Sequence, residues 1–279
     1  MPQPRARLIP SPLTTTLEAS LAALRVELEV PDGFPAEVIA AAEDAAAAVS
    51  VDPQETGIDD LRDIAFLTID PEGSTDLDQA LHVERSGDGG VVHYAIADVP
   101  AFVEPGGAID LEARRRGQTL YAPDLSIRPH PPVLSEHTAS LLPGVDRRAF
   151  VWRFELDAGA AMVSVTLRRA VVRSRRQGAY DEAQRAIDGG SAPPELAALA
   201  WFGPRRSARE RERGGASLDV PDTRVVLDDG PARIERVPTL SIERWNAQLS
   251  LMTGMAAAEL MLAGGVGLPP TVPSMPMGG

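Results

Sequence analysis

The feature that most constrains the fold of this chain is a pair of apolar segments separated by a short glycine-rich stretch. Residues 80–84 and 91–97 flank Ser86-Gly-Asp-Gly-Gly90, a strong pattern for a β-hairpin. Residues 149–155 and 162–167 form a second such pair around Asp157-Ala-Gly159. A short apolar run at 64–69 adds a further strand. Together these segments predict an antiparallel sheet.

Helical patterns lie on both sides of the predicted strands. Leu17, Leu21, Leu24 and Leu28 recur at helical spacing and predict a helix over 15–29, followed by an Ala-rich helix over about 35–49. Further helices are expected at 180–187, at 194–213 and after Ser241, which we interpret as an N-cap. Gly264-Gly265 ends the last helix. The fold class is therefore α+β.

Three regions follow from these patterns. Residues 1–58 form a helical N-terminal region and linker, and the linker itself runs from about Pro53 to Asp60. Residues 59–264 form the main domain, and residues 265–279 are an irregular Pro/Gly-rich tail. The Pro-rich stretch 118–143 has no periodicity, so we expect a long ordered loop of the kind that carries function.

The composition excludes several classes of protein. The chain has no cysteine, which excludes a disulfide framework and a thiolate metal site, and no apolar run is long enough to span a membrane. All 27 basic residues are arginine, yet the net charge is −13, which argues against a large electrostatic surface for nucleic acid. We expect a monomeric cytoplasmic protein without a membrane partner.

An aspartate cluster directly after the strand at 64–69 is the strongest candidate site. Asp70, Asp76 and Asp78, with Glu72, fall within nine residues of a loop that also contains Pro and Gly. Carboxylates are hard oxygen ligands, so this loop predicts a Mg²⁺ site, with Mn²⁺ as a substitute. The alternative is an acidic turn whose aspartates cap backbone amides. The spacing is not that of an EF-hand, and the four histidines show no zinc pattern.

The motifs around this cluster resemble those of the RNB (ribonuclease II/R) exoribonuclease family. The aspartates belong to Thr68-Ile-Asp70-Pro-Glu-Gly-Ser-Thr-Asp76-Leu-Asp78-Gln-Ala80. The motifs that follow in the family's order are Tyr94-Ala-Ile-Ala-Asp98-Val, Gly106-Gly-Ala-Ile-Asp110-Leu-Glu-Ala113, Arg116-Gly-Gln-Thr-Leu-Tyr121-Ala-Pro123, Pro132-Val-Leu-Ser135 and Ser140-Leu-Leu142. Five motifs in one order are far more specific than any one of them.

The resemblance implies an RNB-type catalytic domain that hydrolyses single-stranded RNA from its 3′ end with Mg²⁺ and releases nucleoside 5′-monophosphates. DNA is not an expected partner. By position, Asp70, Asp76 and Asp78 hold the metals and position the attacking water, and Gln79 is expected to contact a metal through its side-chain carbonyl. Tyr121 is expected to stack on the terminal base and Arg116 to contact RNA. For the arginines at 114–116, 168–169, 173 and 175–176, phosphate contact and a solvated face are equal alternatives.

Four departures from the family pattern limit this expectation. Gln79 replaces the usual fourth aspartate, Asn246 stands where a Glu-Glu pair is usual, and only Leu218 or Val220 is available where a stacking Phe is common. The later Ser-Pro-x-Arg motif is absent from these 279 residues, which suggests a truncated member. The alternative is therefore that this chain is a truncated or catalytically impaired RNB-fold protein with an RNA-binding or regulatory role.

Overall fold

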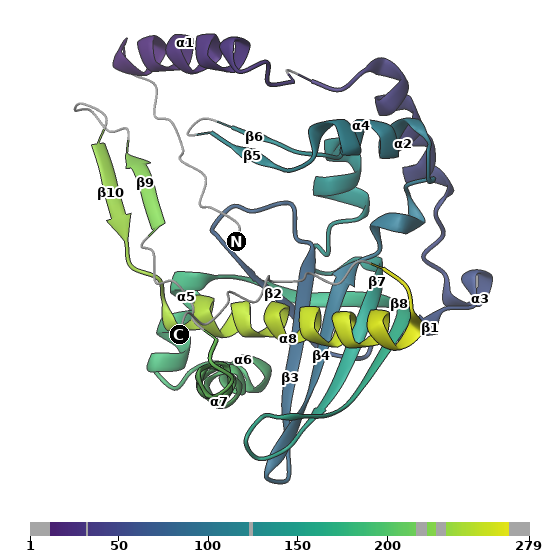
Figure 1. Ribbon diagram of the computed structural model, residues 1–279, viewed down its shortest axis with the longest axis vertical. Helices are drawn as coiled ribbons and strands as arrows, with labels where there is room; N and C mark the ends of the chain where they lie inside the picture. Colours follow the sequence, from purple (N-terminus) through teal and green to yellow (C-terminus); the bar gives the residue numbers. More distant parts are fainter. Residues whose placement is uncertain (1–11, 32, 123–124, 216–221, 227–232, 268–279) are drawn as a thin grey trace, which may run out of the picture.

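The computed structural model describes residues 12–31, 33–122, 125–215, 222–226 and 233–267. A twisted sheet forms the lower half of the molecule, and the N-terminal helices lie above it (Figure 1). The expected Leu218 and Val220, the tail from residue 268 onward and residues 1–11 lie outside the described residues.

Six strands form the main sheet, in the order β1-β8-β2-β3-β4-β7. They are β1 (Asp59–Asp60), β2 (Phe66–Asp70), β3 (Gln79–Ser86), β4 (Gly89–Ala97), β7 (Asp146–Leu156) and β8 (Met162–Ala179). Strand β8 is long enough to pair with β7 along its first part and with β2 along its last. The pairings β2-β3-β4-β7-β8 therefore close on themselves, which leaves little free sheet edge.

The two faces of this closed sheet have different side chains. The inner face is lined largely by small residues, including Ala80, Ala95, Ala149 and Ala170, together with Phe66. Small side chains suit the narrow interior of a closed sheet. The outer face carries larger residues, such as Leu81, Tyr94 and Phe154, which need a second layer to cover them.

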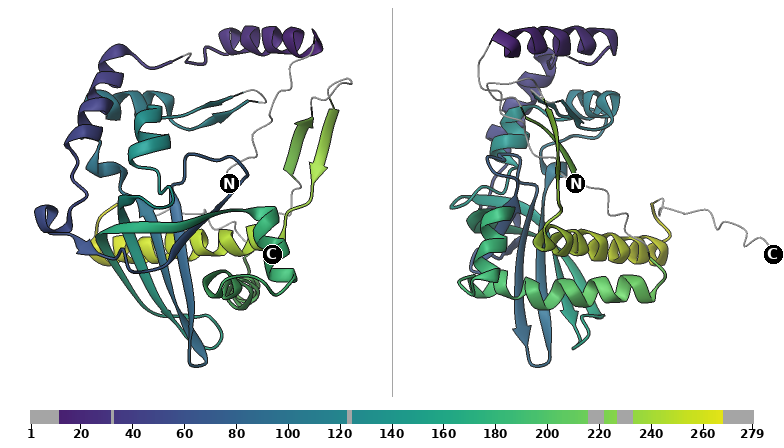
Figure 2. Two further views of the ribbon diagram at one scale, coloured as in Figure 1. Left: turned by 180° about the vertical axis from the view of Figure 1, so that it is seen from behind. Right: turned by 90° about the vertical axis from the view of Figure 1, so that its left-hand side faces the viewer.

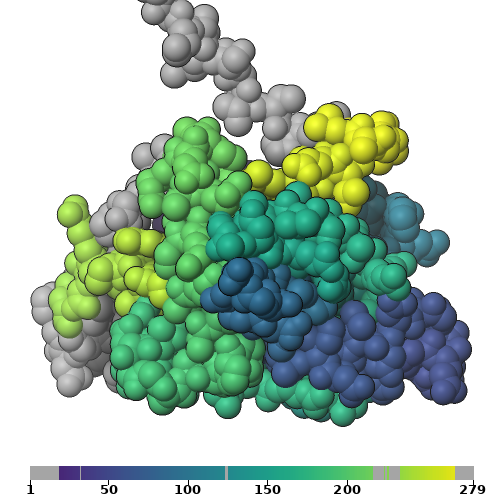
Figure 3. Space-filling model, turned by 90° about the horizontal axis from the view of Figure 1, so that it is seen from below, coloured from purple at the N-terminus to yellow at the C-terminus, as the bar shows by residue number. Residues whose placement is uncertain are grey.

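Helices supply that second layer. They are α5 (Tyr180–Asp188), α6 (Pro194–Ala197), α7 (Leu199–Glu212) and α8 (Ser241–Gly264). Helices α7 and α8 lie side by side against the sheet (Figure 2), and Leu199, Phe202, Leu249 and Met252 are fully buried there or nearly so. From below, the β3–β4 and β7–β8 turns lie beside α7 (Figure 3). Two contacts hold them there: the Arg85 guanidinium lies 4.6 Å from the centre of the Trp201 ring, and Arg205 donates to the Ala158 carbonyl.

The remaining elements surround the aspartate loop or lie above it. A third apolar cluster, with Val38, Phe102, Ile109 and Leu134, joins α2 to α4 and η2. A separate two-stranded sheet, β9 (Asp222–Val226) with β10 (Arg233–Val237), precedes α8. The other elements are α1 (Pro12–Glu27), α2 (Ala36–Ala48), α3 (Pro53–Thr56), η1 (Val99–Ala101), α4 (Ala108–Arg116), β5 (Leu120–Tyr121), β6 (Ser126–Ile127) and η2 (Val133–Thr138).

The α+β class is confirmed, as are both hairpins. Strand β8, however, extends twelve residues beyond the predicted end at 167, to Ala179. For the arginines in this extension the sequence left phosphate contact and a solvated face as alternatives, but Ala170, Val171 and Val172 between them are fully buried or nearly so. Strands β1 and β2 also pair parallel to β8, which the hairpin patterns did not predict.

Three local predictions also need correction. The stretch 118–143 contains the hairpin β5–β6 and a π-helical turn, η2, although the sequence suggested irregular structure only. The predicted linker at 53–60 contains α3 and β1. The N-cap of α8 is Leu240 rather than Ser241, because the Glu243 carboxylate accepts the Leu240 backbone N–H at 2.9 Å. Within the described residues, no helix combines the length and apolarity that crossing a membrane requires.

Candidate active site

The aspartate loop, residues 70–79, connects β2 to β3. Asp70 is the last residue of β2 and Gln79 the first of β3, so both ends of the loop are fixed by the sheet. Gly73 has φ +78°, a left-handed conformation that side chains rarely adopt, and it turns the chain between the strands. The sheet thus brings Asp70 and Asp78 near each other although they are eight positions apart in the sequence.

The Pro-rich segment holds the middle of the aspartate loop. The Ser140 hydroxyl accepts the Leu77 backbone N–H at 2.9 Å and donates to the Thr75 carbonyl at 2.7 Å. The Leu141 N–H donates to the Leu77 carbonyl at 2.7 Å, and Gln177 from β8 donates to Ser74. Backbone groups that would otherwise be unsatisfied are therefore paired, and the loop has a defined shape.

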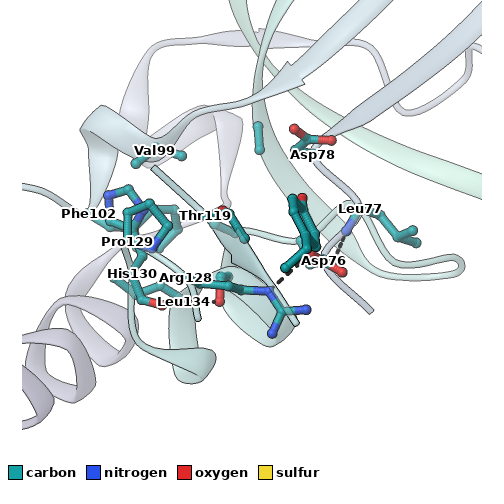
Figure 4. Close-up of a pocket in the computed structure, with 15 residues that line it drawn as sticks. Asp76, Leu77, Asp78, Val99, Phe102, Thr119, Arg128, Pro129, His130 and Leu134 are labelled. Carbon is teal, nitrogen blue, oxygen red and sulfur yellow. Dashed lines mark hydrogen bonds and ion pairs between the residues drawn. The ribbon is translucent and has the colours of Figure 1, made fainter. Parts of the chain in front are cut away.

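Asp76 is held by an arginine from the same Pro-rich segment. The Arg128 Nε lies 3.0 Å from an Asp76 carboxylate oxygen (Figure 4), and its Nη1 donates to Glu136, which also accepts from Thr75. The Arg128 side chain is only 11% exposed. Asp76 therefore already has a cationic partner from within the protein.

Among the described residues, neither Asp70 nor Asp78 has such a partner. No arginine or histidine of the described residues forms an ion pair with either carboxylate. Burial, with repulsion from Asp78 and Asp76, raises the pKa of Asp70 to about 7. Asp78 keeps contact with solvent, but the surrounding protein desolvates its carboxylate and raises its pKa, with a smaller contribution from Asp76. Both carboxylates would be stabilised in their charged form by a cation.

A cavity of about 270 Å³ opens beside the loop. Asp76, Asp78 and Arg128 contribute its polar wall, and Tyr121 lines it with 45% of its surface exposed. In Figure 4, Asp78 lies on the opposite side of Asp76 from Arg128, and Phe102, Pro129, His130 and Leu134 form an apolar wall. The structure thus brings the expected Asp76, Asp78 and Tyr121 to one cavity.

The structure does not bring Arg116 to this cavity. Its side chain is 3% exposed, pairs with Glu112 at 2.7 Å, and lies 3.8 Å over the Phe34 ring. It also donates to the Arg128 carbonyl at 3.2 Å and to the Gly33 carbonyl. Arg116 connects α4 to the N-terminal region here, and its expected contact with RNA stays a prediction.

Gln79 also turns away from the cavity. Its amide oxygen accepts the hydroxyl of Tyr94, which is 1% exposed, and the hydroxyl of Ser250 on α8 lies 3.4 Å away. Asp98, from the motif at 94–99, is fully buried between Arg169, at 2.7 Å, and Arg148, at 3.4 Å.

The donor set fits a hard divalent cation only in part. Within the described part of the chain, Asp70 and Asp78 are two carboxylates without an arginine or histidine partner, which is the environment such an ion stabilises. Across the described part of the chain, no three His, Cys, Asp or Glu side chains are gathered closely enough to hold a metal. The ion pair with Arg128 explains why Asp76 does not join Asp70 and Asp78 as a third metal-ligating side chain.

Several residues that form hydrogen bonds or ion pairs with the aspartate loop were not identified from the sequence. Arg128, Gln177 and Ser250 carry no local signal, because their contacts join residues 52 to 171 positions apart. Ser140 belonged to a recognised motif, but its contact with the aspartate loop was not predicted. Tyr94 likewise stood in a motif without an assigned contact.

Comparison with known proteins identifies the family. The chain is 34% identical over 175 residues to the human "Exosome complex exonuclease RRP44", covering 61% of this chain and 18% of that protein. It is 45% identical over 133 residues to the "Inactive exonuclease DIS3L2" of Arabidopsis thaliana, covering 47% of this chain and 13% of that protein. The structure of Mycoplasma genitalium RNase R with double-stranded RNA matches with a TM-score of 0.80 at 24% identity, covering 89% of this chain and 46% of that one.

The chain thus spans less than half the length of each of these relatives. The RNB domain itself matches residues 58–268, which include the aspartate loop, the cavity and all of the main sheet. The motifs, the fold and this match agree, and the chain belongs to the RNB family.

Proposed function

We propose that this chain carries the metal-binding part of the active site of a hydrolytic 3′→5′ exoribonuclease, which releases nucleoside 5′-monophosphates from single-stranded RNA. One observation supports this most directly: the Asp78 carboxylate and the exposed Tyr121 ring line the same cavity. Asp70 lies close enough to Asp78 that repulsion between the two carboxylates adds to burial in raising the pKa of Asp70. The site therefore has a place for a cation beside a surface for a base.

Each residue has a distinct role in this proposal. Asp70 and Asp78 hold Mg²⁺, for which Mn²⁺ can substitute, and Asp76 joins them when Arg128 releases it. When bound, the ion lowers the pKa of a water molecule and neutralises charge that develops on the phosphate. Tyr121 stacks on the terminal base, a contact that tolerates any base because every base has a π face.

The proposal includes the reducing cytoplasm as the compartment, a monomeric state and no action on DNA. These relate to a whole protein, and this chain spans less than half the length of the relatives described above. The family relation supports an exoribonuclease, and the site geometry supports the placement of the reaction at the aspartate loop.

Degradation of a 5′-labelled single-stranded RNA in the presence of Mg²⁺ tests the proposal. We expect shortening from the 3′ end, no shortening in EDTA, and none of a DNA of the same sequence. Asp78→Asn should lower the rate at least about 100-fold, as expected when a group that stabilises transition-state charge is lost. Asp88→Asn, on the exposed β3–β4 turn, is the matched control and should leave the rate unchanged.

A second candidate is an RNB-fold protein that binds RNA without cleaving it. The incomplete set of metal-ligating side chains among the described residues supports this candidate, and the chain is equally similar, at 45% identity, to a relative named an exonuclease and to one described as inactive. In that case labelled RNA binds but stays intact with Mg²⁺ and with Mn²⁺, and Asp78→Asn changes neither result. Cleavage that Asp78→Asn abolishes would exclude it.

A further inference from the structure

Gln79 and Asp78 are neighbours in sequence, but their side chains face different surroundings. Asp78 lines the cavity, whereas Gln79, the first residue of β3, does not. Consecutive side chains at a strand point to opposite faces of the sheet. Gln79 shares its face with Leu81 and Tyr94, the face that α8 covers.

The Gln79 amide oxygen belongs to a closed triangle of hydrogen-bonding groups. It accepts the Tyr94 hydroxyl and lies 3.4 Å from the Ser250 hydroxyl, while those two hydroxyls are 2.9 Å apart. The two hydroxyls have one hydrogen each, so the amide oxygen accepts from Tyr94, and Ser250 donates either to this oxygen or to the Tyr94 oxygen. Little capacity is left on this oxygen for a metal ion.

A second contact of the same kind lies one helical turn earlier on α8. Asn246 donates to the Tyr180 hydroxyl at 3.2 Å, and positions 246 and 250 lie on one face of the helix. Tyr180 directly follows Ala179, the residue of β8 that pairs with Asp70. Neutral side chains of α8 thus contact residues at both ends of the aspartate loop: Tyr180, next to the strand partner of Asp70, and Gln79.

We propose that Gln79 is a positioning residue rather than a metal ligand. With Tyr94 and Ser250 it fixes α8 against the end of the aspartate loop, and it leaves Asp70 and Asp78 to hold a single divalent cation. This differs from the expectation that Gln79 binds metal. The single-cation part rests on the function proposed above, whereas the link to α8 does not.

The number of bound ions tests the first part. Mn²⁺ titration of the chain, followed by the electron paramagnetic resonance of free Mn²⁺, should give one ion per chain. Gln79→Glu has the same shape and adds a charge; we expect one ion and a Kd changed by less than about threefold, below the range for altered metal ligation. Asp78→Asn should weaken binding at least about tenfold.

Opposite results distinguish two failures. Two ions bound to the unmodified chain would overturn the single-cation inference. In Gln79→Glu, a second bound ion, or binding at least about tenfold tighter, would show that position 79 faces the cation and would also overturn it. No Mn²⁺ bound to the unmodified chain would instead overturn the metal site of the proposed function and, with it, the single-cation part.

The link to α8 is tested without metal. Gln79→Met, Ser250→Ala and the double variant are compared by thermal unfolding in EDTA. The double variant should lower Tm by less than the sum of the two single variants, because they break the same contact. Additive shifts would overturn the link.

Positioning is separated from general stability by a rescue. Gln79→Met should raise the Kd for Mn²⁺ at least about tenfold, within the range of groups that orient metal ligands, and Gln79→Glu should restore it. Gln118→Met, at an exposed position, is the matched control and should change neither Kd nor Tm. Wild-type Mn²⁺ affinity in Gln79→Met would overturn the positioning role.

Discussion

At the scale of single residues, one hydroxyl determines much of the loop that carries the site. Ser140 accepts from the Leu77 N–H and donates to the Thr75 carbonyl, and it is 2% exposed. No water can replace it readily at such a position. The aspartates are therefore placed by a serine more than sixty residues away in the sequence.

Ser140→Ala is expected to lower the free energy of unfolding by about 1–3 kcal/mol, because it leaves a buried donor and acceptor without a partner. Urea denaturation measures the change. Ser135→Ala is the matched control in the same segment, since its hydroxyl makes only long contacts, 3.3 and 3.4 Å, to backbone carbonyls. Equal effects of the two variants would contradict the role of Ser140.

At the scale of elements, the outer layer depends on the close approach of α7 and α8. Gly203 on α7 lies directly against Trp245 on α8: a Cβ at position 203 would fall 2.0 Å from the Trp245 Cγ. Both helices pack on the sheet through the same apolar cluster, and α8 also carries Ser250. A glycine in the middle of a helix is therefore explained by packing.

Gly203→Ala should destabilise the protein by at least about 2 kcal/mol, because the ring must move out of a packed layer. Gly254→Ala, on α8, has open space around the added methyl group and is the matched control. It should raise the free energy of unfolding by about 0.5–1 kcal/mol through helix propensity. Thermal or urea unfolding of both variants measures the difference, and a stabilising Gly203→Ala would refute the packing argument.

The β3–β4 hairpin should also make stability depend on pH. Burial, with the charges of His82 and Arg153, lowers the pKa of His93 to about 4, and Glu84 opposes this in part. The unfolded chain, with a pKa near 6.5, then binds the proton more readily. Stability is therefore complete above about pH 6.5 and is lost as pH falls toward 4.

His93→Gln should remove part of this dependence, on the order of 1–2 kcal/mol between pH 6.5 and 4.5, because His93 is only half-buried. The measurement is urea unfolding at several pH values. His137→Gln, at an exposed position, serves as the control. An unchanged slope in His93→Gln would show that other groups cause the acid sensitivity.

At the scale of the whole molecule, the arginines of β8 form ion pairs with nearby aspartates. The net charge is −13, and arginines of β8 pair with aspartates of neighbouring strands or the strand ends: Arg168 with Asp59, Arg169 with Asp98 and Arg173 with Asp146. Paired arginines give little net attraction for phosphate. This favours a solvated face over a path for the RNA backbone.

RNA binding by this chain should accordingly depend weakly on salt. We expect the slope of log K against log [NaCl] to be below about 2 in magnitude, which corresponds to fewer than about three phosphate contacts on a single strand. Fluorescence anisotropy of labelled RNA in EDTA gives the slope without cleavage. A slope steeper than about 4 would show that the arginines leave their aspartates to bind phosphates.

The sequence by itself determined the α+β class, both hairpins, the helix positions within a few residues and the aspartate loop as the candidate site. These depend on local patterns: alternation, helical spacing and turn residues act between neighbours in the chain. The full length of β8 was missed because its buried residues are interspersed with arginines whose partners lie on other strands.

Only the tertiary structure decided what each polar group of the site contacts. Arg128 holds Asp76, Ser140 holds the loop, and Gln79 turns to Tyr94 and Ser250. Each of these contacts joins residues from 15 to 171 positions apart. Hydrogen bonds and ion pairs act over a few ångströms, and only the packing of the Pro-rich segment and α8 against the sheet brings those groups within reach.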